Sequence, residues 1–269
     1  MQSRAFVLAV AASMSVAGIA SADIVTQWNF PAVVAPPINS PVPDIGSGAS
    51  ITLGMNNAFN GGNTAADDIV SSPSAAVPAF SENTWRIRGS THNGWATHAA
   101  GAPQYSQGSE LDSNTTGFSN ISFSFDWYCT NQGIRDLQVQ YNLDTTSPVG
   151  WTNIGGTSPT GTYIAVPNDF YGAGGAISHT PISVDFSSLL AANNDANFGV
   201  RLVAAFDSTG HVPSDFASAT LLTGATQLYN NSSGNWRFGN LTFSGTTPAP
   251  SSASLLGLGG LLASRRRRA

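Results

Sequence analysis

Lysine is absent from this chain of 269 residues, and all ten of its basic residues are arginines. Five of the arginines lie at the two ends, at position 4 and at positions 265–268. The stretch from Asp23 to Thr247 therefore carries five arginines against all fifteen acids, a net charge of −10. A protein that binds nucleic acid through a basic surface needs clustered lysine or arginine to contact phosphates. The composition excludes that class, and we expect no nucleic-acid partner.

Long hydrophobic runs are also lacking. Ser13, Ser15 and Gly18 interrupt the N-terminal apolar run, and the C-terminal apolar segment is shorter than the about 20 residues that span a bilayer. At the N-terminus, Arg4 precedes an apolar run over residues 5–20, which leads into the small residues Ala20-Ser21-Ala22. This order is typical of a secretory signal peptide. We expect residues 1–22 to be removed by signal peptidase, with Ala20 and Ala22 forming the cleavage site.

The C-terminal residues 248–269 hold a second export feature. Pro248-Ala249-Pro250 leads into an apolar segment over residues 253–263, which is followed by Arg265, Arg266, Arg267 and Arg268. A short apolar segment with a basic end inserts with that end on the cytoplasmic side. A chain with a cleavable export signal would then hold its tail in the membrane while its body lies outside.

This arrangement resembles the PEP-CTERM sorting signal, with Ala249 in place of the usual glutamate. The resemblance implies cleavage by an exosortase-type membrane protease after transient insertion of the tail. It also implies a final location in the cell envelope, at the cell surface or in the extracellular matrix. Scattered stretches of the body, such as Trp85-Arg86-Ile87-Arg88-Gly89, are similar to exported β-sandwich domains of PEP-CTERM proteins, for which no established active site is implied.

The body has little helical periodicity, and alternation with period two predicts half-buried strands instead. The clearest case places Ile121, Phe123, Phe125, Trp127 and Cys129 on one face. Similar patterns predict strands at 24–30, 137–143, 182–186, 198–206 and 236–244, and a hairpin between 137–143 and a strand that begins at Trp151. Seven or more antiparallel strands in residues 23–247 fit one all-β domain, an antiparallel, jelly-roll-like β-sandwich with long loops.

Three local features refine this prediction. Trp236 and Phe238 are out of phase with Leu241 and Phe243, so we expect a β-bulge at Gly239-Asn240. Residues 186–193 could form one or two helical turns with Ser187 as the N-cap. If the first and last strands are neighbours, the two ends of the domain lie close together.

Cysteine occurs once, so no intramolecular disulfide can form. Cys129 falls on the apolar face of its strand, where we expect it to pack as a small buried hydrophobe. The four histidines are His92, His98, His179 and His211. Only His92 and His98 could approach each other, and a zinc site needs three or four ligands, so we favour a pair without metal.

Several carboxylates fall in stretches that we expect to be loops. Calcium takes six to eight oxygen ligands, and Asp67, Asp68 and Asp112 are the candidates for a structural calcium site. No other cofactor is expected. Carboxylates such as Glu110 and Asp112 could instead form a glycosidase pair, since that reaction uses two carboxylates about 5–10 Å apart. With fifteen acids present, such pairs are expected by chance.

Six tryptophans are spread along the body. The phases of Trp28, Trp127 and Trp236 predict core positions, whereas Trp95 and Trp151 fall at turns. An exposed aromatic ring can stack on a sugar, so these two are the candidate carbohydrate contacts. We expect the five body arginines to pair with acids or aromatic rings, with a carboxylate-binding clamp as the alternative.

Two functions stay open at this point. The favoured one is a non-enzymatic, exported β-sandwich of the cell envelope or extracellular matrix with a structural or adhesive role. The alternative is a carbohydrate-binding module or glycoside-active enzyme of the cell surface, with extracellular polysaccharide as its partner. Two carboxylates facing each other across an aromatic-lined groove would favour the second function, and a closed, convex sandwich would remove it.

Overall fold

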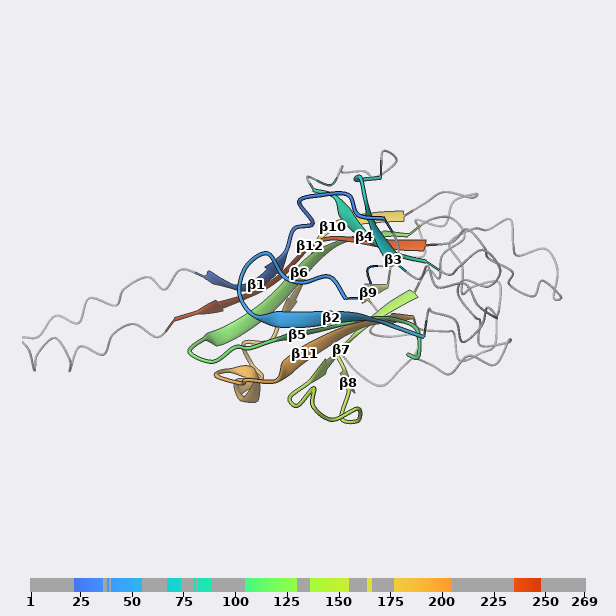
Figure 1. Ribbon diagram of the computed structural model, residues 1–269. Helices are drawn as coiled ribbons and strands as arrows, with labels where there is room; N and C mark the ends of the chain where they lie inside the picture. Colours follow the sequence, from blue (N-terminus) through green and yellow to red (C-terminus); the bar gives the residue numbers. More distant parts are fainter. Residues whose placement is uncertain are drawn as a thin grey trace, which may run out of the picture.

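Two antiparallel six-stranded sheets pack face to face in the computed structural model of the protein (Figure 1). The structure describes residues 22–35, 38, 40–54, 67–73, 80, 82–88, 105–129, 136–154, 164–165, 177–204 and 235–247. The predicted antiparallel β-sandwich is therefore confirmed. No helix within these ranges is long and apolar enough to cross a membrane.

The first sheet, sheet A, is built around the last strand, β12 (Asn235–Thr246). Its order is β10 (Ile177–Asp185), β6 (Ser119–Cys129), β12, β4 (Thr84–Arg88) and β3 (Asp67–Val70). The first strand, β1 (Asp23–Trp28), pairs with the second half of β12, whereas β4 pairs with the first half. The first and last strands are thus neighbours, as expected, with Asp23 opposite Gly245.

The second sheet, sheet B, has the order β2 (Gly48–Leu53), β5 (Gly108–Ser113), β11 (Phe198–Ala204), β7 (Asp136–Asn142) and β8 (Thr152–Asn153). A further short strand, β9 (Ile164–Ala165), also pairs with β7. The pairing of β7 with β8 confirms the predicted hairpin. Because β5, β6 and β7, and then β10, β11 and β12, alternate between the sheets, the topology is jelly-roll-like.

Aromatic side chains fill the space between the sheets. Phe198 of sheet B meets Phe243 of sheet A edge-on at 6.1 Å between ring centroids. The expected core tryptophans, Trp28, Trp127 and Trp236, are all fully buried. Cys129 is buried with them, as its position on the apolar face predicted. The hydrophobic alternation in the sequence therefore identifies the inner face of both sheets.

The expected bulge is present in β12, where the register shifts between Gly239 and Thr242. Asn240 takes the extra position with a left-handed φ of 49°. The helix prediction was only partly right, because a single 3₁₀ turn covers Leu190–Ala192. Its N-cap position is Leu189, so the predicted cap at Ser187 was wrong. The Ser187 hydroxyl donates instead to Asp185 Oδ2 at 3.0 Å.

Candidate functional site

The outer face of sheet B carries polar side chains in rows that run across the strands. Asp112 of β5, Gly199 of β11 and Asn142 of β7 are paired in one row. The next row holds Glu110, Arg201 and Gln140. The intervening residues of β11 are buried in the core, so these rows point away from it. We call this surface the sheet B face.

Trp151 is the one aromatic ring that the hairpin brings onto the sheet B face next to these rows. The guanidinium carbon of Arg201 lies over its ring, 3.9 Å from the ring centroid. Arg201 is in turn fixed by Glu110, with Nε donating to Oε2 at 2.8 Å and the terminal nitrogen at 2.7 Å from the same oxygen. An ion pair under one side of the indole ring orients it, and Trp151 stays partly exposed.

Gly199 makes room for this arrangement. A Cβ atom at position 199 would lie 2.2 Å from Thr145 Cγ2 and 3.3 Å from Trp151 Cη2. Real Cβ atoms do not approach other atoms as closely as the first of these distances, so a side chain would displace Thr145. The glycine therefore lets both Thr145 and Trp151 lie close to the backbone of β11.

A polar pocket of about 260 Å³ opens beside Thr145, at the end of the sheet B face. Asp112 contributes a carboxylate whose Oδ1 accepts the backbone N–H of Ala49. The lining offers hydroxyl, amide and carboxylate groups, and its residues are Ser47, Gly48, Ala49, Asp112, Ser113, Asn114, Thr145, Ala196 and Asn197. Donors and acceptors of this kind recognise hydroxyl groups.

Amide side chains continue the sheet B face past Trp151. Gln140 Nε2 donates to Asn153 Oδ1 at 2.8 Å, and Asn153 Nδ2 donates to Tyr105 Oη at 3.1 Å. Asn142 Nδ2 donates to the carbonyl of Val149 at 3.0 Å. These bonds hold the amides in fixed orientations before any ligand arrives, which lowers the entropy that binding would cost.

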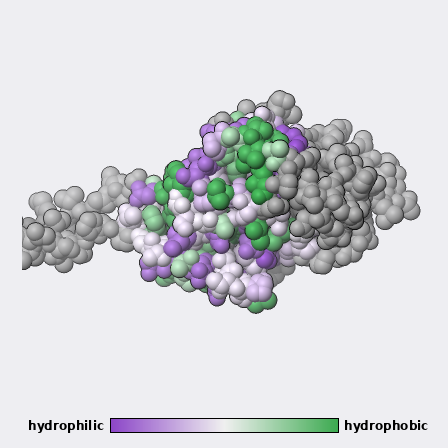
Figure 2. Space-filling view, viewed as in Figure 1, coloured by the Kyte–Doolittle hydropathy of each residue, from purple (hydrophilic) through white to green (hydrophobic). Residues whose placement is uncertain are grey.

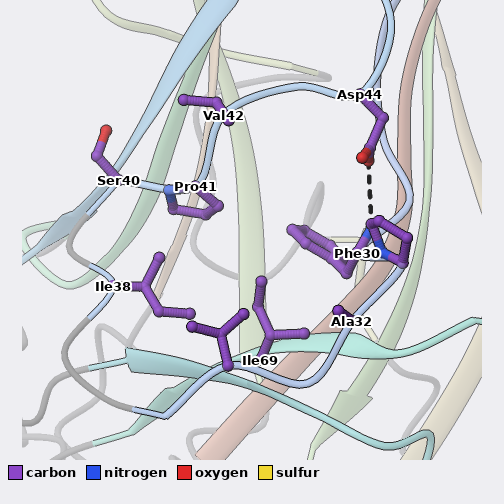
Figure 3. Close-up of a pocket in the computed structure, with 10 residues that line it drawn as sticks. Phe30, Ala32, Ile38, Ser40, Pro41, Val42, Asp44 and Ile69 are labelled. Carbon is purple, nitrogen blue, oxygen red and sulfur yellow. Dashed lines mark hydrogen bonds between the residues drawn. The ribbon is translucent and has the colours of Figure 1, made fainter.

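A second hollow, of about 300 Å³, lies between the β1–β2 connection and β3. Figure 3 shows that its walls are apolar, with Phe30, Ile38, Pro41 and Ile69 around it. Its carboxylate, Asp44, already accepts the backbone N–H groups of Asn29 and Phe30, at 2.6 and 3.3 Å.

Around this hollow, Figure 2 shows hydrophobic surface where the connection and β3 lie, and the exposed apolar residues there include Val33, Val34, Val42 and Ile45. The hollow offers apolar contact but few free polar groups. The sheet B face is therefore the better candidate for a polar ligand.

The structure separates the carboxylates that were expected to bind calcium. Asp67 and Asp68 lie in strand β3 of sheet A, not in a loop, and Asp112 lies in sheet B. Asp67 Oδ2 accepts the indole N–H of Trp85 at 2.8 Å, and Asp68 forms an ion pair with Arg86. No group of three or more His, Cys, Asp or Glu side chains that could hold a metal occurs in the described ranges.

Other predicted residues have different outcomes. Trp95, His92, His98 and His211 lie outside the described residues, as do residues 1–21 and 248–269 of the two terminal export segments. His179 is in β10, but its side chain is not described. Glu110 and Asp112 do share the outer face of β5, two positions apart, but Arg201 holds Glu110 in an ion pair.

Arg201 pairs with an acid and an aromatic ring, as the sequence predicted for the body arginines, but the sequence did not identify Asn153 or Tyr105 as parts of a site. Arg201, Asn153 and Tyr105 belong to different segments of the chain. Strand pairing brings β11, β7 and β8 together, and the bond from Asn153 reaches Tyr105 outside the strands. An Arg at an outward position of an otherwise apolar strand was the available signal for Arg201.

The geometry defines a β-sandwich with a polar outer face built around one oriented tryptophan. In sequence, the chain matches no protein-family profile and no curated protein.

Solved structures give weak similarities. They include the K1 cleaved adhesin domain of Lys-gingipain from Porphyromonas gingivalis, at 13% identity over 83% of this chain and 97% of that one, with a TM-score of 0.37. A carbohydrate-binding module specific for non-crystalline cellulose has 14% identity over 71% and 88% of the two chains, with a TM-score of 0.38. A family 29 carbohydrate-binding module has 11% identity over 74% and 92%, with a TM-score of 0.26. At these values the similarities assign no function to this chain.

Proposed function

We propose that this protein is an exported, non-catalytic adhesive module that binds a neutral polysaccharide through the sheet B face. The observation that carries the proposal is the partly exposed Trp151 ring, stacked on Arg201 beside a polar pocket. An aromatic ring offers an apolar face to the C–H groups of a sugar ring. The neighbouring pocket supplies hydrogen-bond partners for its hydroxyl groups.

Charge favours a neutral ligand. The body carries a net charge of −10, and the site itself contains the carboxylates Glu110 and Asp112. A surface of this sign repels polyanions. Because the positive charge of Arg201 is compensated by Glu110, it does not reverse that repulsion.

Binding without catalysis fits the chemistry of the face. Glycoside hydrolysis requires one carboxylate as acid and a second as base or nucleophile. Glu110 is committed to the guanidinium of Arg201, because Nε and a terminal nitrogen of Arg201 both contact its Oε2 atom. The same ion pair orients Trp151, so Glu110 and Arg201 would support binding of the sugar.

Export and sorting belong to the same proposal. A signal peptide over residues 1–22 and a PEP-CTERM-like segment over residues 248–269 would deliver the β-sandwich to the cell surface or extracellular matrix. Asp23 and Gly245 are paired neighbours, so both segments start from the same end of the body. The domain that carries the polysaccharide-binding face would then be anchored to the membrane, or cut from it, at that end.

A glycan array probed with the purified protein tests the proposal. We expect the wild type to bind at least one neutral polysaccharide, Trp151→Ala to lose most of that binding, and Trp151→Phe to keep most of it, because a phenyl ring still stacks. Loss of one stacked ring corresponds to about a tenfold or greater drop in affinity, by the usual size of aromatic contacts.

Ile24→Ala is the control, since Ile24 is an exposed apolar residue on β1 of sheet A. It should bind as the wild type does. The proposal fails if the folded wild type binds no neutral glycan, or if Trp151→Ala binds as well as the wild type does. Near-ultraviolet circular dichroism of each variant establishes that the domain is folded.

A further inference from the structure

The outer face of sheet A carries a second polar row that the proposed function does not use. Cross-strand pairing places Asp68, Arg86, Arg237 and Tyr128 side by side on β3, β4, β12 and β6. The residues before and after Arg237 are fully buried in the core, so Arg237 points outward. Two arginines are thus directly opposite each other in a body that has only five.

Arg86 has its charge balanced. Its Nε donates to Asp68 Oδ1 at 2.7 Å, and its terminal nitrogen forms an ion pair with Asp68 Oδ2. A guanidinium and a carboxylate joined by two parallel bonds are a saturated pair. Asp68 is therefore bonded to Arg86 and acts on Arg237 through its charge, without an ion pair to it.

Arg237 differs from Arg86 in its partners. Its Nε donates to the amide oxygen of Asn235 at 3.2 Å, and its guanidinium carbon lies 5.6 Å from the ring centroid of Tyr128. Within the described part of the chain, no carboxylate lies within salt-bridge distance of Arg237 and its terminal nitrogens have no hydrogen-bond acceptor. Directly opposed like charges destabilise a pair of strands, so the charge of Arg237 beside that of Arg86 costs stability that an anion would recover.

The surroundings increase the attraction for an anion. Burial lowers the pKa of Arg237 and the charge of Arg86 lowers it further, while Tyr128 and Asp68 oppose the shift without cancelling it. Burial also raises the pKa of Tyr128, so its ring stays neutral beside the guanidinium. Phe80 packs with Tyr128 and lies next to Gly239, which makes the neighbourhood partly apolar. A charge-assisted hydrogen bond is stronger in such a setting than in water.

We infer that Arg237 is a binding site for a carboxylate group, of the kind that a uronic acid carries. The planar fork of a guanidinium matches the two oxygens of a carboxylate. The net charge of −10 on the body disfavours multiply charged anions, so a monoanionic group is preferred over a phosphate. Because this site is on sheet A and the neutral-glycan face is on sheet B, either site can exist without the other.

Calorimetric titration of the purified protein with sodium glucuronate, sodium acetate, glucose and sodium chloride at fixed ionic strength tests this inference. We expect the wild type to bind glucuronate and acetate saturably, and not to bind glucose or chloride. The affinity of Arg237→Gln for glucuronate should be weaker by about tenfold or more. Arg237→Lys keeps the charge but loses the fork, so its affinity should lie between those of the other two proteins.

Equal affinity of Arg237→Gln and wild type, or an equal response to chloride, would overturn the inference. If Arg237→Gln does not fold, the inference is tested on the wild type through the nuclear magnetic resonance signal of the Arg237 Nε–H group. A glucuronate-dependent shift of that signal, which Arg237→Lys identifies by removing it, supports the site, and a signal that does not move with glucuronate refutes it.

Discussion

Asp67 does not lie where the sequence predicted it. An acid next to another acid was expected to lie in a loop, yet Asp67 is fully buried in β3. Its carboxylate accepts the indole N–H of Trp85 across the strand pair, at 2.8 Å. Alternation in β3 then places Asp68 on the outer face, where it meets Arg86. Two adjacent acids thus have two separate structural roles.

The hydrogen bond between Asp67 and Trp85 should contribute measurably to stability. We expect Asp67→Ala to lower the free energy of unfolding by about 2–3 kcal/mol, because it leaves a buried indole N–H without its acceptor. A double-mutant cycle with Trp85→Phe separates this bond from the cavity that each change creates. Urea unfolding should give a coupling energy of about 1–3 kcal/mol. A coupling near zero would show that the bond adds nothing.

At the scale of single elements, β12 is the strand on which sheet A depends. It pairs with β6 on one side and with β1 and β4 on the other. The bulge at Asn240 restores the apolar phase, so that Phe238, Leu241 and Phe243 all reach the core. Asn240 Oδ1 also accepts a hydrogen bond from Gln27 Nε2 at 3.0 Å, which ties the bulge to β1.

The left-handed backbone of Asn240 gives a prediction about this bulge. A β-branched side chain is strained at a φ of 49°, so Asn240→Val should destabilise the protein by about 1–2 kcal/mol more than Asn240→Gly. Both variants lose the bond to Gln27, and their difference isolates the backbone. Thermal and urea unfolding measure it. Equal stability of the two variants would mean that the bulge relaxes at no cost.

Much of the element pattern could be predicted from the sequence, because alternation is a local signal. It located β6, β7, β11 and β12 and the bulge. The Ser187 cap was wrong because the 3₁₀ turn begins only at Leu190, with Leu189 at the N-cap position. Register could not be predicted, since it depends on contacts between distant segments. Arg201, Trp151 and Glu110, and likewise Arg86 and Arg237, become neighbours only through it.

At the scale of the whole molecule, the distribution of charge connects the two proposed sites. Removal of both terminal segments would leave a body of charge −10. On that body Arg201 is balanced by Glu110, and Arg86 is balanced by Asp68. Arg237 is therefore distinctive among the described arginine side chains. On this acidic surface a neutral polymer suits the sheet B face, and a single carboxylate suits Arg237, which forms no ion pair within the described residues.

Processing at the two ends is the remaining proposal at this scale, and intact mass spectrometry of the cell-associated protein tests it. We expect the mass to lack residues 1–22 and the C-terminal arginines. Replacement of Arg265, Arg266, Arg267 and Arg268 by glutamine should leave the tail attached, because the apolar segment loses the charges that hold it across the membrane. Ala249→Glu restores the residue usual in the PEP-CTERM motif, so it should be cut at least as completely as the wild type. A surface protein that still spans Met1 to Ala269 would contradict both export steps, while leaving the tests of Trp151 and Arg237 unaffected.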